Sequence, residues 1–590
     1  MTDDIAAGGK LWPTVWIGWA IAAVVLVAIS IPGIAHLWFT DPDDAMRLLE
    51  VRDWLNGQSW WDVSQHRLWG GHFAMHWSRL VDLPLALVMV VLDPIVGHAA
   101  STRIALVAVP LATLLAVMAL GAEMSRRLLG IERAKGAVIL AVLSVPLLYQ
   151  LRPMRIDHHG WQIACAMLAV VMLLGRANAR SGAIAGLSLG ALLTISLEGM
   201  PITAAIVGVT AIAWAIDPAR RGQLLAMLWT LTGAVIAFQV VTRGPGMFAP
   251  ACDAIAPAWI AALLAGSVAT GIATVVPRTS LAVRVVMLTV AGAAALATLA
   301  WITPQCLRGP FALLDPFVYR YWYQNIDEGL PVWRQSFAVA AMTLGFPIIG
   351  LIGGGLAWRE AKGEDRARWT LMLTLAGLSF LLSLLVVRTG ATANALALPG
   401  GAYLLHIMLS RARAIGSVLP RTLATAGALL AATPGVAAQV LFGLPQGQPA
   451  AATGAPGGTE IEHPSCHHGH EIADLGRLPP SVIFAPLDAS PDLLVQTEHR
   501  AIAGGYHRNV AAIHRVMATF MADPSVARRS VLASGAAFVA GCPGENETAI
   551  YKEAAPNGLW ARLERGDRID WLQPVPMPGS PVLVWRVKAR

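Results

Sequence analysis

The chain has 590 residues, of which 56% are hydrophobic and only 13% are charged, and its mean hydropathy is +0.59. This composition excludes a water-soluble enzyme and indicates a polytopic membrane protein. The formal net charge of +7 does not require a nucleic-acid partner, because the cytoplasmic loops of membrane proteins collect Lys and Arg.

Thirteen apolar runs are candidates for membrane-spanning helices, each of which needs about 20 apolar residues, or somewhat fewer when its ends snorkel. They lie at 12–37, 101–122, 136–151, 160–175, 182–198, 199–217, 224–242, 255–277, 281–302, 336–357, 369–387, 391–410 and 419–443. A further run at 83–97 contains Asp93 and Pro94, and we expect a re-entrant or interfacial helix there. The first run has no clear small-residue cleavage site, which favours a retained helix.

Positive charges in the connections predict the orientation of these helices. With thirteen spans, the Lys- and Arg-rich connections fall on one side, which is the cytoplasm by the positive-inside rule and also receives the N-terminus. The other side receives three loops, a Gly/Pro/Ala-rich linker and the polar tail, at 38–82, 152–159, 303–335, 444–458 and 459–590.

These assignments predict a mainly α-helical transmembrane domain over 1–443 and a small α/β domain over 459–590. In a bacterium the chain would lie in the inner membrane, with the second domain in the periplasm. Cys466 and Cys542 can pair there, because disulfides persist in an oxidising compartment.

The first outer loop opens with FTDPDDAMR, which places Asp41, Asp43 and Asp44 directly after the first helix. Asp43 or Asp44 can cap the following helix, but a cap explains one carboxylate and not three. Clustered carboxylates suit a hard divalent cation, which takes oxygen ligands. His76 and Arg79 follow in HFAMHWSRLVD and, with Asp43, are candidates to line a donor groove.

The second outer loop reads MRIDHHGWQ. Asp157 and His159 are two residues apart, so in an extended segment both side chains lie on one face and can share a metal with the first loop. His158 is then either a neighbour of the metal site or an alternative ligand. The plain alternative is a solvated loop end between two helices.

Other charged residues fall on the same side. Glu328 lies in the fifth outer loop, Glu198 at an outer helix end and Arg388 at the outer end of the eleventh helix. An arginine at that depth fits a phosphate, although it can also snorkel to lipid head groups. His507 and Arg508, in GGYHRN of the tail, can reach toward an acceptor, whereas the tract HPSCHHGH is expected to be a solvated linker rather than a metal site.

The order of these motifs resembles the catalytic subunit of oligosaccharyltransferases, in the GT-C class of membrane glycosyltransferases, over nearly the whole chain. DPDDAMR resembles the first-loop motif of that family, DHH resembles the archaeal form of its second acidic motif, and NIDE is similar to its TIxE or SVSE motif. The resemblance implies that Asp41, Asp157 and His159 hold a divalent cation, Mn or Mg. It also implies that Glu328 is the acid of the fifth loop and that Arg388 contacts the donor phosphate.

One motif departs from the family. Its outer domain carries WWDYG, which reads the Ser or Thr of the acceptor sequon, whereas this chain has APLDASPDLL at the matching place. Asp488 remains, but Pro486 and Leu487 replace the tryptophans. The following TEHRAIAGGYHRNV again resembles the family. We therefore expect a related domain that acts on an acceptor other than a standard N-glycosylation sequon.

Together these features predict a metal-dependent, inverting transferase that moves a sugar or oligosaccharide from a polyprenyl-phosphate-linked donor in the bilayer to a periplasmic acceptor. Asp41, Asp44 and Glu328 are the candidate catalytic residues, and Glu328 or Asp44 would orient the acceptor or take its proton. One alternative is a transferase that uses a polyprenyl monophosphate sugar. The other is a transporter or flippase for a lipid-linked glycan, which would favour charges deep within the spans.

Overall fold

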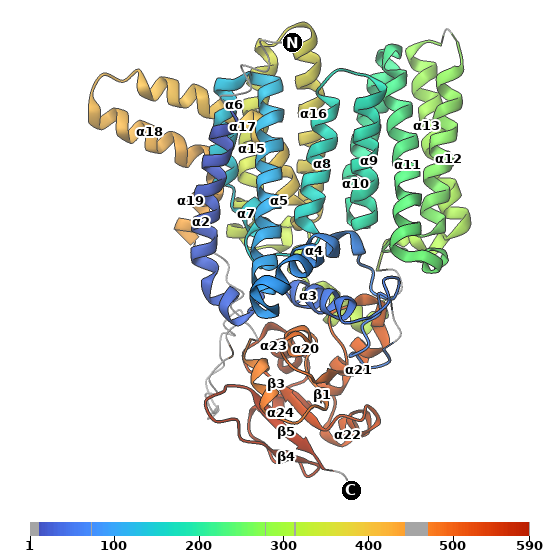
Figure 1. Ribbon diagram of the computed structural model, residues 1–590, viewed down its shortest axis with the longest axis vertical. Helices are drawn as coiled ribbons and strands as arrows, with labels where there is room; N and C mark the ends of the chain where they lie inside the picture. The colour runs from blue at the N-terminus through green and yellow to red at the C-terminus, as the bar shows by residue number, and fades with distance from the viewer. Residues whose placement is uncertain are drawn as a thin grey trace.

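The structure is a computed structural model that describes residues 11–71, 74–277, 279–311, 314–442, 466 and 470–588. An upright bundle of helices forms one part, and a smaller region that contains a sheet lies at one end of the bundle, which we call the domain end (Figure 1). The bundle helices are α2 (Trp12–His36), α5 (His98–Leu129), α6 (Ile131–Val142), α7 (Val145–Leu151), α8 (His159–Leu173), α9 (Ala179–Ile195), α10 (Met200–Ile216), α11 (Arg221–Arg243), α12 (Pro257–Val275), α13 (Leu281–Ile302), α15 (Phe337–Glu360), α16 (Gly363–Leu385), α17 (Gly390–Arg413), α18 (Val418–Ala432) and α19 (Pro434–Phe442).

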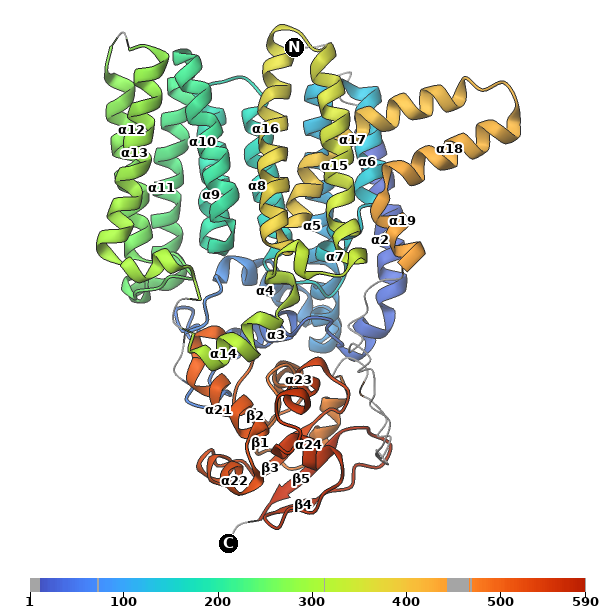
Figure 2. The ribbon, with the colours of Figure 1, turned by 180° about the vertical axis from the view of Figure 1, so that it is seen from behind.

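Each predicted span corresponds to one of these helices or to a bent pair of them. Within the described residues, eight helices are long and apolar enough to cross a membrane, or up to ten if each bent pair is one span. The bent pairs are α6 with α7, at 67°, and α18 with α19, at 94°, while α8 and α9 are apolar but shorter. α18 extends sideways from the bundle (Figure 2), so the last predicted span differs most from a straight crossing. The predicted polytopic, mainly helical fold is confirmed.

Small residues bring α9 and α11 close together. A Cβ added to Gly182 would lie 2.1 Å from the carbonyl oxygen of Gln223, and one added to Gly186 would lie 2.2 Å from that of Met227. Glycine at these positions permits the close approach on which helix packing in apolar surroundings depends. The pairing fixes the end of α9, from which the chain turns through η1 (Leu197–Gly199) into α10.

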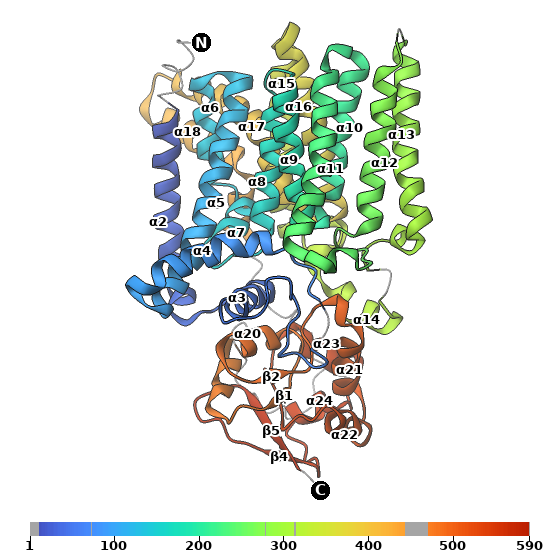
Figure 3. The same cartoon turned by 45° about the vertical axis from the view of Figure 1, so that its right-hand side comes forward.

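Two helices lie across the domain end. α3 (Pro42–Leu55) is capped by Asp41, whose carboxylate accepts the Asp43 amide at 2.9 Å, and α4 (Arg79–Val96) is capped by Ser78. Figure 3 shows α4 running across the ends of the upright helices. Its large exposed apolar side chains are Leu83, Leu87, Val90, Val91, Ile95 and Val96. α4 therefore has the form of the interfacial helix predicted at 83–97.

Short elements connect the bundle helices, and a disulfide links two of the connections. These elements are η2 (Pro218–Arg220), η3 (Gly244–Phe248), η4 (Pro304–Arg308), α14 (Pro316–Tyr321), η5 (Tyr323–Asn325), η6 (Asp327–Gly329), η7 (Val332–Arg334) and η8 (Val387–Thr389). The disulfide Cys252–Cys306, which the sequence analysis did not predict, joins the connection after α11 to the one after α13.

The C-terminal region contains a five-stranded sheet in the order β2-β1-β3-β5-β4. β1 pairs in parallel with β2 and β3, and β5 pairs antiparallel with β3 and β4. The elements are η9 (His470–Arg477), β1 (Val482–Phe484), α20 (Ala489–Gln496), β2 (Arg500–Ala501), η10 (His507–Asn509), α21 (Val510–Met521), α22 (Pro524–Ala533), β3 (Phe538–Gly541), α23 (Asn546–Ala554), α24 (Leu559–Glu564), β4 (Leu572–Pro574) and β5 (Leu583–Val587). Cys466 and Cys542 form a disulfide, the pairing that the sequence suggested; most of the HPSCHHGH tract lies outside the described residues.

Arg67, between α3 and α4, fastens the C-terminal region to the domain end. Its guanidinium donates to the backbone carbonyls of Leu494, Thr497 and His499 at 2.8, 2.5 and 2.6 Å. These three carbonyls lie in the last turn of α20 or between α20 and β2, where a backbone carbonyl often has no partner within the helix or the sheet. One side chain thus satisfies several backbone acceptors across the interface.

Replacing Arg67 by Ala should loosen this attachment. A hydrogen bond to a charged group contributes a net of about 1.5–3 kcal/mol, and contributions of bonds from one side chain are not additive, so we expect a destabilisation of about 2–4 kcal/mol. Thermal unfolding followed by tryptophan fluorescence, together with limited proteolysis of the full chain, would measure it. The matched control is Arg500→Ala, since exposed Arg500 donates one such bond, to the His66 carbonyl at 2.9 Å. Equal effects in both variants would contradict the prediction.

Candidate functional site

The aspartates that follow α2 have different partners. The Asp41 and Asp44 carboxylates lie 2.6 and 2.8 Å from Nη1 of Arg155. The other Asp44 oxygen accepts the backbone N–H groups of Ile156 and Asp157 at 2.8 and 2.9 Å. Asp44, which the sequence made a catalytic candidate, is fully buried and holds the second loop in place.

Asp43 is within electrostatic reach of the other acids of the site. Burial and the negative charges of Asp41, Asp157 and Glu328 raise the pKa of Asp43 well above its usual range. Carboxyl groups gathered in this way repel one another, and a bound cation would remove the repulsion. Sequence analysis ranked Asp43 below Asp41 and Asp44.

Asp157, His158 and His159 form a compact cluster whose potential ligand atoms lie within 4.8 Å of one another. His158 Nδ1 lies 2.5 Å from one Asp157 oxygen, and His159 Nε2 lies 3.4 Å from the other. Burial raises the pKa of Asp157, but the two histidines and Arg47 lower it further, so the group stays a carboxylate.

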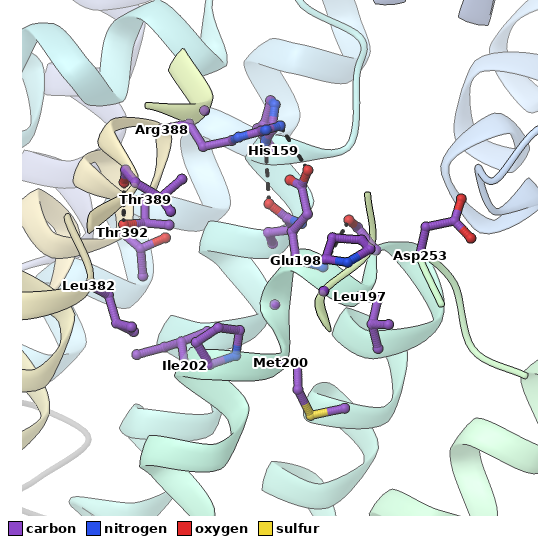
Figure 4. Close-up of a pocket in the computed structure, with 18 of the residues that line it drawn as sticks. His159, Leu197, Glu198, Met200, Ile202, Asp253, Leu382, Arg388, Thr389 and Thr392 are labelled. Carbon is purple, nitrogen blue, oxygen red and sulfur yellow. Dashed lines mark hydrogen bonds and ion pairs between the residues drawn. The ribbon is translucent and has the colours of Figure 1, made fainter. Parts of the chain in front are cut away.

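Arg388 lies between two acids from other connections. Its Nη1 is 2.7 Å from Glu198 on η1 and 3.6 Å from Glu328 on η6. Glu198 is also 3.6 Å from Nε2 of His158, and Figure 4 shows Glu198 between Arg388 and the rest of η1. The structure therefore brings Arg388, Glu328 and Glu198 together with the second loop. The sequence analysis placed these residues on the same side of the membrane but did not predict that they contact one another.

Arg79 lies in a buried network behind this cluster rather than in it. Arg79 and Arg47 bind opposite oxygens of Asp82 at 3.1 and 2.9 Å. Arg47 also reaches Asp157 at 3.4 Å and stacks over Trp77 at 4.6 Å. The two arginines thus join α3 to α4, and Arg47 supports Asp157 from behind.

A second polar cluster combines three separate segments. His507 Nε2 lies 2.6 Å from Asp253, and Arg508 binds both Asp253 oxygens at 2.7 and 2.9 Å. The His76 ring lies 4.7 Å from that of His507. Sequence analysis had named His76, His507 and Arg508 as secondary candidates, but not Asp253.

One cavity of about 530 Å³ joins the two clusters. Its charged or titratable lining residues include His76, His159, Glu198, Asp253, Arg388 and His507. Its apolar wall includes Met200, Ile202 and Ala204 of α10 and Leu382 and Leu385 of α16. In Figure 4 Leu382, Ile202 and Met200 lie apart from Arg388 and Glu198, so the cavity has a charged end and an apolar end.

The residues of the second loop fit a divalent cation. Asp157 offers oxygen and His159 offers nitrogen, a donor set that suits Mn and, less well, Mg. Asp157 Oδ2 is buried and accepts no hydrogen bond among the described residues, although His159 Nε2 stands 3.4 Å from it. A buried acceptor without a partner is costly, and a cation bound there would satisfy it. Asp41 and Asp43 stand next to this position as carboxylates of the first loop.

Two of the residues that the sequence analysis missed carry weak local signals. Arg155 precedes DHH within the quoted motif, and Asp253 follows Cys252 of the disulfide. Neither signal predicts a partner, because Asp253 meets His507 across 254 positions of sequence.

Comparison with known proteins supports the fold. No protein-family model matches the chain, and no curated protein matches its sequence. The archaeal oligosaccharyltransferase AglB from Archaeoglobus fulgidus, solved in complex with an inhibitory peptide and a dolichol-phosphate, is similar with a TM-score of 0.64 at 13% identity, over 93% of this chain and 72% of that chain. The A. fulgidus oligosaccharyltransferase tethered with an acceptor peptide containing the NVT sequon gives 0.61 at 13%, over 98% and 74%. The predicted GT-C fold is confirmed.

Metal binding should require both loops. Calorimetric titration of the purified full chain with Mn is expected to show one site that Asp157→Asn abolishes. Asp43→Asn and Asp41→Asn should each weaken it at least about tenfold, a loss of roughly 1.4 kcal/mol. The first variant removes an acid that faces the cluster, and the second leaves Arg155 less neutralised. Asp93→Asn, on the exposed side of α4, is the control, and Mn binding that survives Asp157→Asn would contradict a metal site in the second loop.

Proposed function

We propose that the chain is a metal-dependent, inverting glycosyltransferase that moves a sugar or oligosaccharide from a polyprenyl-phosphate-linked donor to an acceptor outside the cytoplasm. The observation that carries the proposal is the cavity with an apolar end on α10 and α16 and a charged end at Arg388. A polyprenyl phosphate has the same two-part character. Its isoprenoid chain would lie along the apolar wall, and its phosphate would lie at the guanidinium.

Arg388 is held ready for that phosphate. Glu198 and Glu328 fix the guanidinium at 2.7 and 3.6 Å, so it needs little rearrangement when the donor arrives. Donors fixed in advance stabilise charge that develops in the transition state. Arg388 would therefore bind the donor phosphate and stabilise it as it departs with its bonding electrons.

Asp157 and His159 would hold the cation, with Asp41 or Asp43 as the first-loop ligand. When bound, a divalent cation supplies Lewis-acid stabilisation of the departing phosphate. Asp44, Arg155 and Arg47 would keep these ligands in position through the contacts described above. Attack from the side opposite the phosphate would invert the anomeric centre.

The acceptor is proposed to differ from a standard sequon peptide. Pro486 and Leu487, at the place of the family's tryptophans, are buried, and Glu547 accepts the Leu487 and Asp488 amides at 2.8 and 2.9 Å. A segment bound down in this way offers no indole to a peptide. This supports an acceptor recognised by other residues of the cavity.

The two disulfides support the proposed orientation and location. Cys252–Cys306 and Cys466–Cys542 both lie in connections or domains at the domain end. Disulfides form in oxidising compartments, which supports a periplasmic domain end in a bacterial inner membrane, with residues 459–590 as the periplasmic domain. The charges that line the cavity come from connections at this end, whereas a transporter would favour charges deep within the spans.

Replacing Arg388 should weaken the handling of the donor phosphate. Arg388→Ala is expected to reduce cleavage of an undecaprenyl-diphosphate-linked sugar by about 100- to 1,000-fold, the loss typical when one transition-state donor is removed. Arg388→Lys should recover part of it, because an ammonium retains the charge but not the two-pronged fork.

Undecaprenyl phosphate binding to the full chain, measured by native mass spectrometry, should fall in parallel. Arg334→Ala, an exposed arginine on η7, is the control. The same assay with mono- and diphosphate donors would decide between the two donor classes. Unchanged binding and cleavage in Arg388→Ala would remove the basis of the proposal.

A further inference from the structure

His76, Asp253 and His507, which form a cluster with Arg508, line the same cavity as Arg388. Nε2 of His507 lies within hydrogen-bond distance of the Asp253 carboxylate, at 2.6 Å. Its Nδ1 has no hydrogen-bond partner within the part of the chain that the structure describes, and His507 lines the cavity. One ring nitrogen is thus occupied by a carboxylate while the other is left for a ligand.

The cluster is held rigidly by bonds to the first connection. Arg508 donates to the Ala74 and Met75 carbonyls at 3.0 and 3.3 Å. Arg243, at the end of α11, donates to the His76 carbonyl at 3.0 Å. The Phe311 ring meets that of His507 edge-on at 5.1 Å. A ring fixed by such neighbours keeps its orientation toward the cavity.

A histidine whose N–H is bound by a carboxylate is oriented and stabilised as a proton acceptor at its other nitrogen. We propose that His507, positioned by Asp253, is the catalytic base that takes the proton of a carbohydrate hydroxyl acceptor. The inference rests on the proposed transferase function and specifies its acceptor class. A hydroxyl group is a weak nucleophile until its proton is removed, and general-base assistance typically contributes about 100- to 10,000-fold.

A metal ion is the competing occupant, because the ligand atoms of His76, Asp253 and His507 lie within 4.8 Å of one another. Both Asp253 oxygens are already bound by Arg508. A divalent cation would therefore sit beside a guanidinium and share a carboxylate that is neutralised. That arrangement disfavours a cation and leaves the imidazole of His507 available as a base.

The surroundings of His507 favour a sugar as the molecule that carries the hydroxyl. Phe311 and Tyr323, with ring centroids 4.6 Å apart, line the cavity next to His507. Flat aromatic faces supply contact area at little cost in conformational entropy and match the C–H face of a pyranose ring.

The step balances without any further reactant. The acceptor oxygen forms a bond to the anomeric carbon while the bond from that carbon to the donor phosphate oxygen breaks. The acceptor proton moves to Nδ1 of His507, and the electron pair of the broken bond leaves with the polyprenyl phosphate. His507 then returns its proton to water.

The test uses the full chain in nanodiscs with a radiolabelled undecaprenyl-diphosphate glycan extracted from host membranes. Methyl glycosides, a Ser/Thr peptide and an Asn-X-Thr peptide are offered as acceptors. We expect the label on methyl glycosides. The kcat of His507→Gln should be lower than that of the wild type by a factor of at least about 100, with undecaprenyl phosphate binding unchanged. Imidazole should restore part of the rate of His507→Gly, which a purely structural role would not allow.

The pH profile and a matched histidine separate this role from a structural one. The wild-type rate should fall as pH falls, because a protonated imidazole cannot accept a proton, and His507→Gln should lose that dependence. Among the described residues, the charged or titratable groups around His507 include Asp253, His76, Arg508 and Tyr323. His514→Gln is the control, since His514 makes a similar pair with Asp315, at 3.0 Å, away from the cavity lining.

Each other outcome overturns the inference. Label on the Ser/Thr peptide alone would exclude a carbohydrate as the acceptor. Label on the Asn-X-Thr peptide alone, a wild-type rate in His507→Gln, or one equivalent of zinc that co-purifies and is lost with His507→Gln would each exclude the hydroxyl base. If the wild type binds undecaprenyl phosphate but labels no methyl glycoside, the acceptor inference fails and the donor site stands. If it neither binds the lipid nor cleaves the donor, the proposed function itself fails.

Discussion

The candidate site depends on the buried carboxylate of Asp44, which holds the second loop against the first. It accepts two consecutive backbone amides and pairs with Arg155. The loop needs this restraint, because Met154 has φ of 72°, a left-handed conformation that costs a non-glycine residue about 1–3 kcal/mol. Charge-assisted bonds to a buried carboxylate can offset strain of that size. Without them Asp157 and His159 would have no fixed relation to Asp41 and Asp43.

Charge balance gives the site its second constraint. Asp43, Glu198 and Glu328 place more acidic groups around Arg388 than one guanidinium can pair with, and the raised pKa of Asp43 reflects this excess. A phosphate would add to that excess, and so the lipid phosphate and a cation support each other's binding. Under the proposed function, the acids that bind Arg388 would not simply compete with the donor, because they would prepare a site for a cation and an anion together.

The sequence predicted the structure well where the residues that act together are also neighbours in the chain. The apolar runs located every bundle helix, and DHH placed Asp157 and His159 side by side because they are neighbours in sequence. The span at 419–443 was harder, since its composition is apolar but Pro434 follows Thr433 at the 94° bend. The sequence could not predict a role for Asp253, because Asp253 meets His507 only when the C-terminal region folds against the bundle. Asp44 was recognised as important but assigned to the chemistry, since no pattern distinguishes a carboxylate that supports a loop from one that meets a ligand.

The missing tryptophan motif and the cluster around His507 belong to the same C-terminal region, but only His507 lines the cavity. At the place of the WWDYG motif of the family that the sequence resembles, this chain buries Pro486 and Leu487 in the C-terminal region, and Glu547 accepts the Leu487 and Asp488 amides. Those residues are therefore committed to the core and unavailable to an acceptor. The polar groups that do face the cavity from the C-terminal region belong to His507 and its neighbours, directly after the segment that still resembles the family. Under the proposed function, such a fold would change its acceptor while keeping its donor side, because the apolar wall and the proposed acceptor wall come from different segments of the chain.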